Sequence, residues 1–230
     1  KSLTPGTDTL SNTSLWVDYI YLDTDERRRF AQVSHEYLIE QLQFTGEESV
    51  TSTSKTATLN FNHPVKELVW VCQHDSLITA RQFNNYGSSY YGFDAEDSYQ
   101  NGANAGKGYD QVYGPFRSLN PVSKAKLQLN GHDRFAERQS DYFNYVQPYQ
   151  HHTRTPGVGI NVYSFALKPE EHQPSGTCNF SRIDNAQLQL TLQVGTAGGL
   201  SSAAWKLRVY AVNYNVLRIM SGMGGLAYSN

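Results

Sequence analysis

The side chains that could carry chemistry in this 230-residue sequence are its seven histidines, its two cysteines and carboxylates scattered along the chain. No histidine belongs to an HxH pair or an HExxH motif, the spacings that place metal ligands on one face of an element. His151 and His152 are neighbours and would point in opposite directions on a strand. Cys72 and Cys178 lack a CxxC or Cys/His spacing, which predicts small buried hydrophobic side chains rather than a disulfide or a zinc site. We expect the histidines in exposed loops, and we predict no catalytic residue, no metal and no cofactor.

Other motifs of chemistry are missing from the sequence as well. It has no GxSxG nucleophile elbow, Walker loop or EF-hand loop, although carboxylates that folding brings together would leave no local signature. The glycine-rich stretch at 222–225 is followed by no helix, which excludes a phosphate-binding loop. Two NxS/T sequons begin at Asn12 and Asn179, and these are candidate glycosylation sites.

The composition predicts an all-β protein. Charged residues make up 17% of the chain, against about 25% in an average globular protein, whereas 16 tyrosines and 10 phenylalanines favour strands. The formal net charge is −2 and the longest basic run is 27–29, so no direct nucleic-acid partner is predicted. Every apolar run is shorter than the stretch of about 20 residues that a membrane helix requires, and no signal peptide is evident. We therefore expect a soluble chain without a membrane-spanning segment.

The first quarter of the chain predicts a linker, a strand, a short helix and a second strand. Residues 1–14 are rich in Ser, Thr, Gly and Pro. The apolar run Leu15–Leu22 predicts a strand buried on most of both faces. Asp23, with Glu26 three positions later, has the spacing of a helix N-cap and predicts a helix to about Val33. Residues 36–44 fit a helical or a strand period, and we favour a strand.

Further strands are predicted from alternating or continuous apolar runs, at 57–61, 68–72, 125–129, 160–167 and 186–194. A short helix is expected at 141–146, and Asn130-Gly131 has the composition of a hairpin turn. Long turn-rich connections are expected at 168–181 and 195–202. The last strand begins at Trp205, and its apolar positions change from odd to even near Val212, which predicts a bend, a bulge or a passage between sheets. Seven or eight strands with connections of unequal length predict a β-sandwich or jelly roll.

The segment 75–117 breaks this pattern, because it is dense in Tyr, Asn, Gly and Ser and has no period that would bury one face. Loops of this length are uncommon in compact domains. We consider both a decorated surface loop and a recognition surface, since the same residue types dominate adaptable binding loops. The alternative function is therefore a carbohydrate-binding β-sandwich that uses the Tyr-rich part at 86–113, and an enzyme on a cupin-like barrel ranks last.

Six blocks of sequence resemble a known family. They include LNFNHPVKELVW at 59–70, KLQLNGHDRF at 126–135, YFNYVQPYQ at 142–150 and NYNVLRIMSGMGGLAYSN at 213–230, with longer blocks at 14–46 and 163–190. In this order they resemble the C-terminal part of the major capsid protein of large nucleocytoplasmic double-stranded DNA viruses, of the chlorovirus and iridovirus type. The segment 75–117 shows no family pattern.

The resemblance implies a fold, an organisation and a function. The fold would be a jelly-roll β-sandwich, the second of a double jelly-roll capsid protein, with short helices in its connections. Residues 1–23 would hold a linker and the last strand of a preceding jelly roll, 24–36 the interdomain connection, and 37–230 the C-terminal jelly roll with the surface loop 75–117. The implied function is to form homotrimeric, pseudo-hexagonal capsomers of an icosahedral shell in the virion, in contact with other capsomers and minor capsid proteins. Residues 220–230 would form a compact tail packed on the body or on a neighbouring domain.

Overall fold

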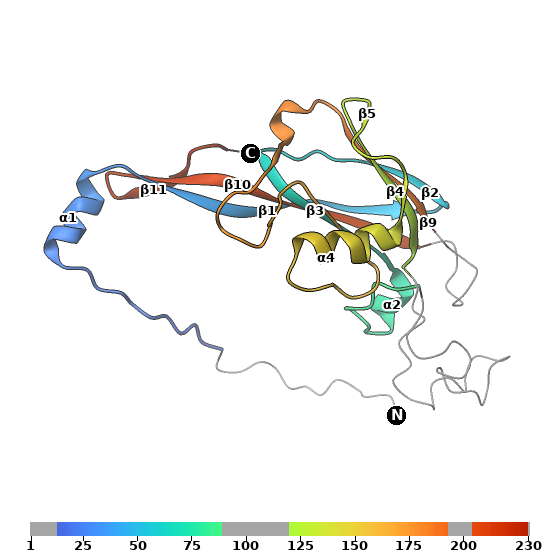
Figure 1. The fold of residues 1–230 in the computed structure, drawn as a ribbon. Helices are drawn as coiled ribbons and strands as arrows, with labels where there is room; N and C mark the ends of the chain where they lie inside the picture. Colours follow the sequence, from blue (N-terminus) through green and yellow to red (C-terminus); the bar gives the residue numbers. More distant parts are fainter. Residues whose placement is uncertain (1–12, 89–119, 193–203, 230) are drawn as a thin grey trace.

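Two antiparallel β-sheets face each other and enclose the core of the molecule (Figure 1). The structure, a computed structural model, describes residues 13–88, 120–192 and 204–229. The main path of the first sheet, sheet A, runs β1 (His35–Val50), β10 (Trp205–Met220), β3 (Pro64–His74) and β7 (Ile160–Ser164). That of the second, sheet B, runs β2 (Ser54–Thr58), β9 (Ala186–Leu192), β4 (Val122–Leu129) and β5 (His132–Asp133).

The first four strands of the chain alternate between the sheets: β1 and β3 belong to sheet A, whereas β2 and β4 belong to sheet B. Because each sheet is assembled from strands distant in sequence, the order is that of a jelly roll with interleaved Greek keys. The all-β, jelly-roll prediction is therefore confirmed. Short strands extend the paths, with β8 (Cys178–Asn179) on β3, β11 (Met223–Leu226) on β10 and β6 (Arg138–Gln139) on β4.

Helices occupy the connections. Those in the described residues are α1 (Thr24–Gln32), α2 (Asp75–Thr79), the π-helix η3 (Tyr142–Val146), α4 (Gln147–His151) and the 3₁₀-helix η4 (Phe180–Arg182). The predicted cap of α1 is confirmed, because Asp23 Oδ1 accepts a hydrogen bond of 2.9 Å from the Glu26 amide. The helix predicted at 141–146 is confirmed as η3, which continues directly into α4.

The core is built from the alternating side chains of the facing strands. β9 buries every second residue, as its sequence predicts. In sheet A, Trp70 of β3 and Trp205 of β10 are each 1% exposed, and Trp70 meets Phe143 of η3 edge-on at 5.1 Å between ring centroids. The η3 helix therefore closes one side of the space between the sheets.

A bulge lies beside β10 where its apolar pattern changes, but it belongs to β3. The register of β10 against β3 shifts between Val212 and Asn213, and Lys66 is the extra residue on β3. β10 itself stays in sheet A, so it does not pass between sheets. Asn213, Tyr214 and Asn215 are all buried, because both faces of β10 are covered at this point.

Two predictions at the ends of the chain need correction. Residues 15–22 form no strand, and their apolar side chains are exposed, because the described part of the chain offers them neither a neighbouring strand nor a second layer. The tail, predicted to be compact and packed on the body or on a neighbouring domain, does lie on the body, but as a hairpin strand with exposed side chains. It turns back as β11 along β10, with Met223–Leu226 exposed, and is held by the amide of Asn215, which donates to Tyr228 O at 2.9 Å.

Both cysteines are free; Cys72 is buried, as predicted, whereas Cys178 is only partly buried. Complete burial raises the pKa of the Cys72 thiol from 9.0 to about 12, and partial burial raises the pKa of Cys178. We expect Cys72 of the folded chain to resist a thiol reagent at pH 8 and to react only after unfolding in urea, while Cys178 reacts slowly, because the thiolate is the nucleophile. Mass spectrometry of alkylated peptides measures both rates.

The raised pKa of Cys72 makes the free energy of unfolding depend on pH, and the sign of this dependence follows from the shift. Between pH 9 and about 12 the unfolded chain loses the Cys72 proton while the folded chain keeps it, so the contribution of this thiol to the free energy of unfolding falls as pH rises through that window. Rapid alkylation of Cys72 under native conditions would contradict its assigned burial.

Candidate assembly surface

The histidines do not all lie in exposed loops, where the sequence predicts them. His63 and His74 are buried, so the prediction is wrong for both. His74 lies at the start of α2, where its Nδ1 accepts a hydrogen bond from the Ser76 amide at 3.1 Å. The His74 imidazole therefore caps a helix, whereas His63 lies directly before β3 with a positive φ of 66°. Among the residues that the structure describes, no three His, Cys, Asp or Glu side chains are grouped as metal ligands.

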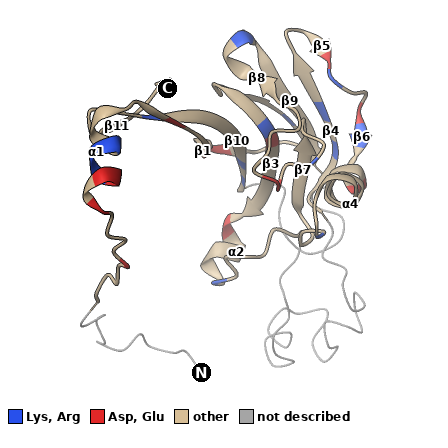
Figure 2. Cartoon of the chain, turned by 60° about the vertical axis from the view of Figure 1, so that its left-hand side comes forward, with Lys and Arg blue, Asp and Glu red and all other residues tan. Residues whose placement is uncertain are grey.

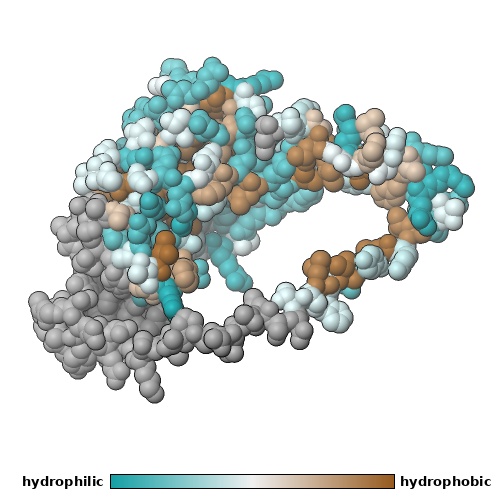
Figure 3. Space-filling model, turned by 180° about the vertical axis from the view of Figure 1, so that it is seen from behind, coloured by the Kyte–Doolittle hydropathy of each residue, from teal (hydrophilic) through white to brown (hydrophobic). Residues whose placement is uncertain are grey.

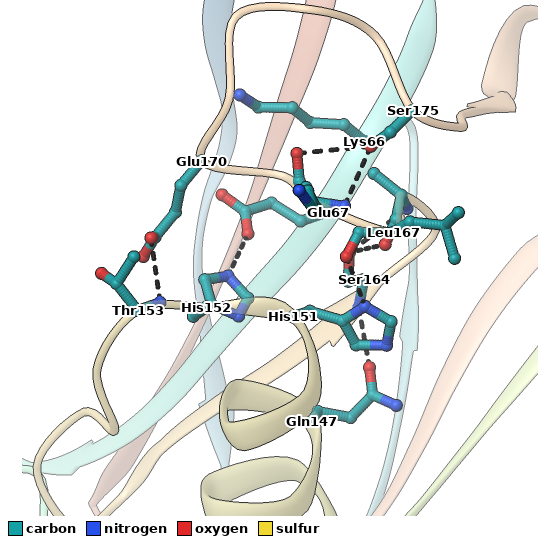
Figure 4. Close-up of polar contacts among 12 residues, drawn as sticks. Lys66, Glu67, Gln147, His151, His152, Thr153, Ser164, Leu167, Glu170 and Ser175 are labelled. Carbon is teal, nitrogen blue, oxygen red and sulfur yellow. Dashed lines mark hydrogen bonds and ion pairs between the residues drawn. The ribbon is translucent and has the colours of Figure 1, made fainter.

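His152 makes the closest contact between a histidine and a carboxylate that the structure describes. Its Nε2 lies 2.8 Å from Oε2 of Glu67 on β3, a residue 85 positions away in sequence (Figure 4). The two side chains are only 12% and 15% exposed. Local spacing could not reveal this pair, because the partners come from different elements. The pair fastens the end of α4 across the outer face of sheet A.

Neighbouring contacts strengthen the same attachment. Nδ1 of His151 lies 2.9 Å from Leu167 O, and the Thr153 amide donates to Glu170 Oε2 at 2.9 Å (Figure 4). The hydrogen bonding of Thr153 lowers the pKa of the Glu170 carboxyl. Each acid or base in this group holds a loop, so the arrangement supports a structural role.

Two buried amides seal the β7 edge of sheet A. Asn144 Nδ2 donates to Ile160 O at 2.8 Å, and Gln147 Oε1 accepts from the Ser164 amide at 3.1 Å. Both partners are backbone groups of the outermost strand, and both amide side chains are buried. The η3–α4 helices thus satisfy the backbone groups that a further strand would pair with.

Removing these amides should weaken the domain. We expect Asn144→Ala and Gln147→Ala each to lower the free energy of unfolding by about 1–3 kcal/mol, because a buried backbone group loses its partner. Urea unfolding followed by tryptophan fluorescence measures the change. Tyr149→Ala is the control, since this side chain of the same helix is 86% exposed. Equal unfolding midpoints for all three variants would show that the amides do not stabilise the edge.

The opposite edge of sheet A has a different character. On the face turned away from sheet B, β1 carries Leu38, Leu42 and Phe44, which are 36%, 64% and 46% exposed. Register places them beside Val216, Val212 and Tyr210 of β10, and Phe44 stacks on Tyr210 at 4.8 Å between centroids. These six residues form an apolar surface, interrupted on β1 by Glu40 between Leu38 and Leu42, which we call the β1–β10 outer face.

The charged residues of that face are paired with one another. The pairs are Glu36 with Arg218, Glu40 with Lys66, and Glu47 with Arg208. In each of these pairs an acid of β1 lies against a base of β10 or, across β10, of β3. Charges of both signs are also intermixed over the rest of the ribbon, without a large basic patch among the described residues (Figure 2). Such a surface is suited to protein contacts rather than to phosphate binding.

The segment before α1 adds a second exposed apolar surface, which we call the arm, residues 13–22. Trp16 and Tyr21 are 92% and 90% exposed, and open space separates the arm from the body (Figure 3). Single exposed apolar residues are ordinary, but a run of this size marks an interaction site.

The predicted glycosylation sites stay predictions. Asn12 and most of the Tyr-rich segment 86–113 lie outside the described residues. Asn179 is exposed on β8, where its Oδ1 accepts a hydrogen bond of 3.1 Å from the Ser181 amide. The hydroxyl of Ser181 in turn accepts from the His63 amide at 2.8 Å.

Within residues 13–88, 120–192 and 204–229, no helix combines the length and the apolar character that crossing a bilayer would require. The strand order, the sealed β7 edge and the two apolar surfaces define a β-sandwich of the jelly-roll class with a surface suited to protein contacts. The chain belongs to the family of large eukaryotic DNA virus major capsid proteins, whose sequence model matches residues 26–225.

Individual relatives agree with this assignment. The chain is 52% identical over 281 residues to the major capsid protein of Phaeocystis pouchetii virus, covering 96% of this chain and 54% of that protein. It is 48% identical over 248 residues to the major capsid protein of Paramecium bursaria Chlorella virus 1, covering 94% of this chain and 54% of the relative. Among solved structures, the PBCV-1 virus capsid aligns with a TM-score of 0.68 and 43% identity, covering 92% of this chain and 56% of that chain.

These comparisons confirm the family resemblance inferred from the sequence blocks. They also show that the chain spans about half the length of the relatives it matches.

Proposed function

We propose that this chain is the C-terminal jelly roll of a major capsid protein and forms part of the shell of an icosahedral virion. The observation that supports this most strongly is the match of the family model across 26–225, combined with a jelly-roll strand order in the described residues. The similarity to the PBCV-1 virus capsid structure supports the same function. The role is structural, and we propose no catalytic residue.

The proposed organisation places residues 37–230 in the second of two jelly rolls. Residues 24–36, which include α1, would be the interdomain connection, and residues 1–23 would contain the last strand of the first jelly roll. The exposed apolar arm supports this division, because Leu15–Leu22 has the composition of a buried strand but no partner strand among the described residues.

The proposed assembly is a homotrimeric capsomer with a pseudo-hexagonal outline. Three copies of two similar domains present six wedges, which tile a hexagonal lattice under closed symmetry. Capsomers would contact one another and minor capsid proteins. Sheet edges sealed by side chains, as at β7, favour this specific assembly because they suppress unspecific strand pairing.

Native mass spectrometry and electron microscopy of the full-length protein test the proposal. We expect a trimer of a chain about twice the length of the present one, consistent with the 54% coverage of the relatives. A full-length protein that stays monomeric under all assembly conditions would exclude the capsid function. The carbohydrate-binding alternative depends on 86–113, and nothing among the described residues favours it.

A further inference from the structure

The hairpin of β4 and β5 at the edge of sheet B contains a chemically labile residue pair (Figure 1). Asn130 and Gly131 form the whole loop, because Leu129 pairs directly with His132. Both loop residues are exposed and adopt positive φ angles, which Asn and Gly tolerate better than other residues. In an Asn-Gly pair the side-chain amide is also open to attack by the next backbone nitrogen, because glycine adds no side chain that would hinder the approach.

Asn130 is held by more than the turn. Its backbone amide donates to Asn185 O at 2.7 Å, and its side-chain Oδ1 accepts a hydrogen bond of 3.1 Å from the Asn185 amide. In the register of β4 with β9, Leu129 lies opposite Ala186, so these two bonds extend the ladder by one position. The side-chain oxygen takes the place of a strand carbonyl there. The carboxamide of Asn130 is therefore fixed against the segment that leads into β9.

The reaction open to this pair is deamidation. The Gly131 backbone nitrogen gives its proton to a solvent base and attacks Cγ of Asn130. A nitrogen–Cγ bond forms, the Cγ–Nδ2 bond breaks, and Nδ2 takes up a proton and leaves as ammonia, so that a succinimide ring remains. Water then opens one of the ring bonds to the nitrogen. Opening at Cγ gives aspartate, whereas opening at the main-chain carbonyl gives isoaspartate, in which the backbone runs through the side chain.

The folded geometry opposes the first step. Closing the ring requires the Gly131 nitrogen and Cβ of Asn130 to lie on the same side of the Asn130 Cα–C bond. A residue with a φ of 51° is in the left-handed region, where ψ is about +30 to +60°. These angles turn the next nitrogen nearly opposite to Cβ and out of reach of Cγ. The hydrogen bond from Asn185 also holds the carboxamide on the β9 side, so ring closure requires the hairpin to open.

We propose that Asn130 is a deamidation site which the native fold keeps closed and which reacts only when the β4–β5 hairpin opens. The rate in the native protein then follows the population of the open hairpin, because opening and closing are fast relative to this slow reaction. The products differ in their effect. Aspartate keeps an oxygen that accepts from Asn185 and tolerates a positive φ. Isoaspartate adds a backbone atom to the loop and cannot rebuild the tight turn.

Deamidation rates in the full-length protein test the proposal. The protein is incubated at neutral pH, either folded in buffer or unfolded in guanidinium chloride, and peptides that span position 130 are quantified by mass spectrometry over time. We expect conversion in the folded protein to be slower by at least about tenfold, which corresponds to a hairpin-opening free energy of about 1.4 kcal/mol. The pair Asn101-Gly102 is the matched control for the chemistry, because both pairs should react at similar rates in guanidinium chloride.

A second measurement tests the hydrogen bond that holds the site. Hydrogen exchange of the Asn185 amide is compared in the variants Asn130→Asp and Asn130→Ala. We expect Asn130→Asp to exchange close to the rate of the original protein, since a carboxylate accepts the same bond. Asn130→Ala should exchange about tenfold faster, because the amide loses its acceptor. Both variants lack the reactive carboxamide, so neither can deamidate at this position.

Equal rates at position 130 in the folded and the unfolded protein would overturn the protection by the fold. A position 130 that stays intact in guanidinium chloride while Asn101 converts would overturn the site itself. Unchanged exchange of the Asn185 amide in Asn130→Ala would show that the side chain does not hold the hairpin, which also contradicts the proposal. None of these outcomes depends on assembly, so they are independent of the proposed capsid function.

Discussion

Trp70→Ala is expected to lower the free energy of unfolding of the 230-residue chain by about 3–5 kcal/mol, the usual cost of deleting a large aromatic side chain from a core. Trp70 is 1% exposed on the central strand β3 and contacts Phe143, so its removal opens a cavity between the sheets and η3. Since small domains are stable by about 5–15 kcal/mol, a large share of the variant should be unfolded at modest urea concentrations. Urea unfolding monitored by circular dichroism measures the loss.

The chain offers a control of the same residue type. Trp16 lies in the arm and is 92% exposed, so Trp16→Ala should leave the unfolding midpoint of this chain unchanged. Trp70→Phe should cost less than Trp70→Ala, because the ring remains and the buried Nε1, which has no hydrogen-bond partner, is removed. Equal destabilisation by the Trp16 and Trp70 alanine variants would contradict the core described here.

Glu40→Ala is expected to lower the free energy of unfolding by about 3 kcal/mol, because it leaves the buried ammonium of Lys66 without its counter-charge. The side chain of Lys66 is 4% exposed, and its Nζ lies 2.6 Å from Glu40 Oε1. The ring of Tyr214 lies 5.5 Å from the same nitrogen and supplies only a weaker cation–π attraction. The bulge at Lys66 brings this cation under the outer face, so the pair joins β3 to β1 across β10.

Removing both charges should be less harmful than removing one. The double variant Glu40→Leu with Lys66→Met replaces the pair by apolar groups of similar size and is expected to lie within about 1 kcal/mol of the original chain. The control pair is Glu36 with Arg218, whose side chains are 54% and 48% exposed. Glu36→Ala should change stability by about 0–1 kcal/mol. A double-mutant cycle measured by urea unfolding decides, and a double variant as unstable as Glu40→Ala would refute the desolvation argument.

The cap of α1 and the strand alternations could be predicted because they depend on neighbours in sequence. Asp23 caps the amide of Glu26 three residues away, and β9 buries every second side chain. The turn at Asn130 and Gly131 follows the same rule, since both residues adopt positive φ angles of 51° and 80° between β4 and β5. Such local preferences survive in the fold because packing favours the same conformation.

The roles of individual polar residues could not be predicted in this way. The pairing of His152 with Glu67, and the sealing of β7 by Asn144 and Gln147, join elements that are distant in sequence. A buried amide and an exposed amide have the same signature in a sequence. The prediction of exposed histidines was wrong at His63 and His74 for this reason, because burial is decided by which element packs on which.

The arm is apolar in sequence and yet exposed, so an apolar run does not by itself decide burial. By itself the sequence determined an all-β chain, most of its strands and the α1 cap, because the hydrophobic period and the turn residues depend on neighbours in the sequence. It also determined the family, because the family blocks occur in the same order along the chain. Only the tertiary structure decided the order of the strands in the two sheets, the bulge at Lys66, the sealed edge and the exposure of Leu15–Leu22. The physical reason is that pairing and burial belong to two surfaces in contact, and a strand's own residues specify only one of them.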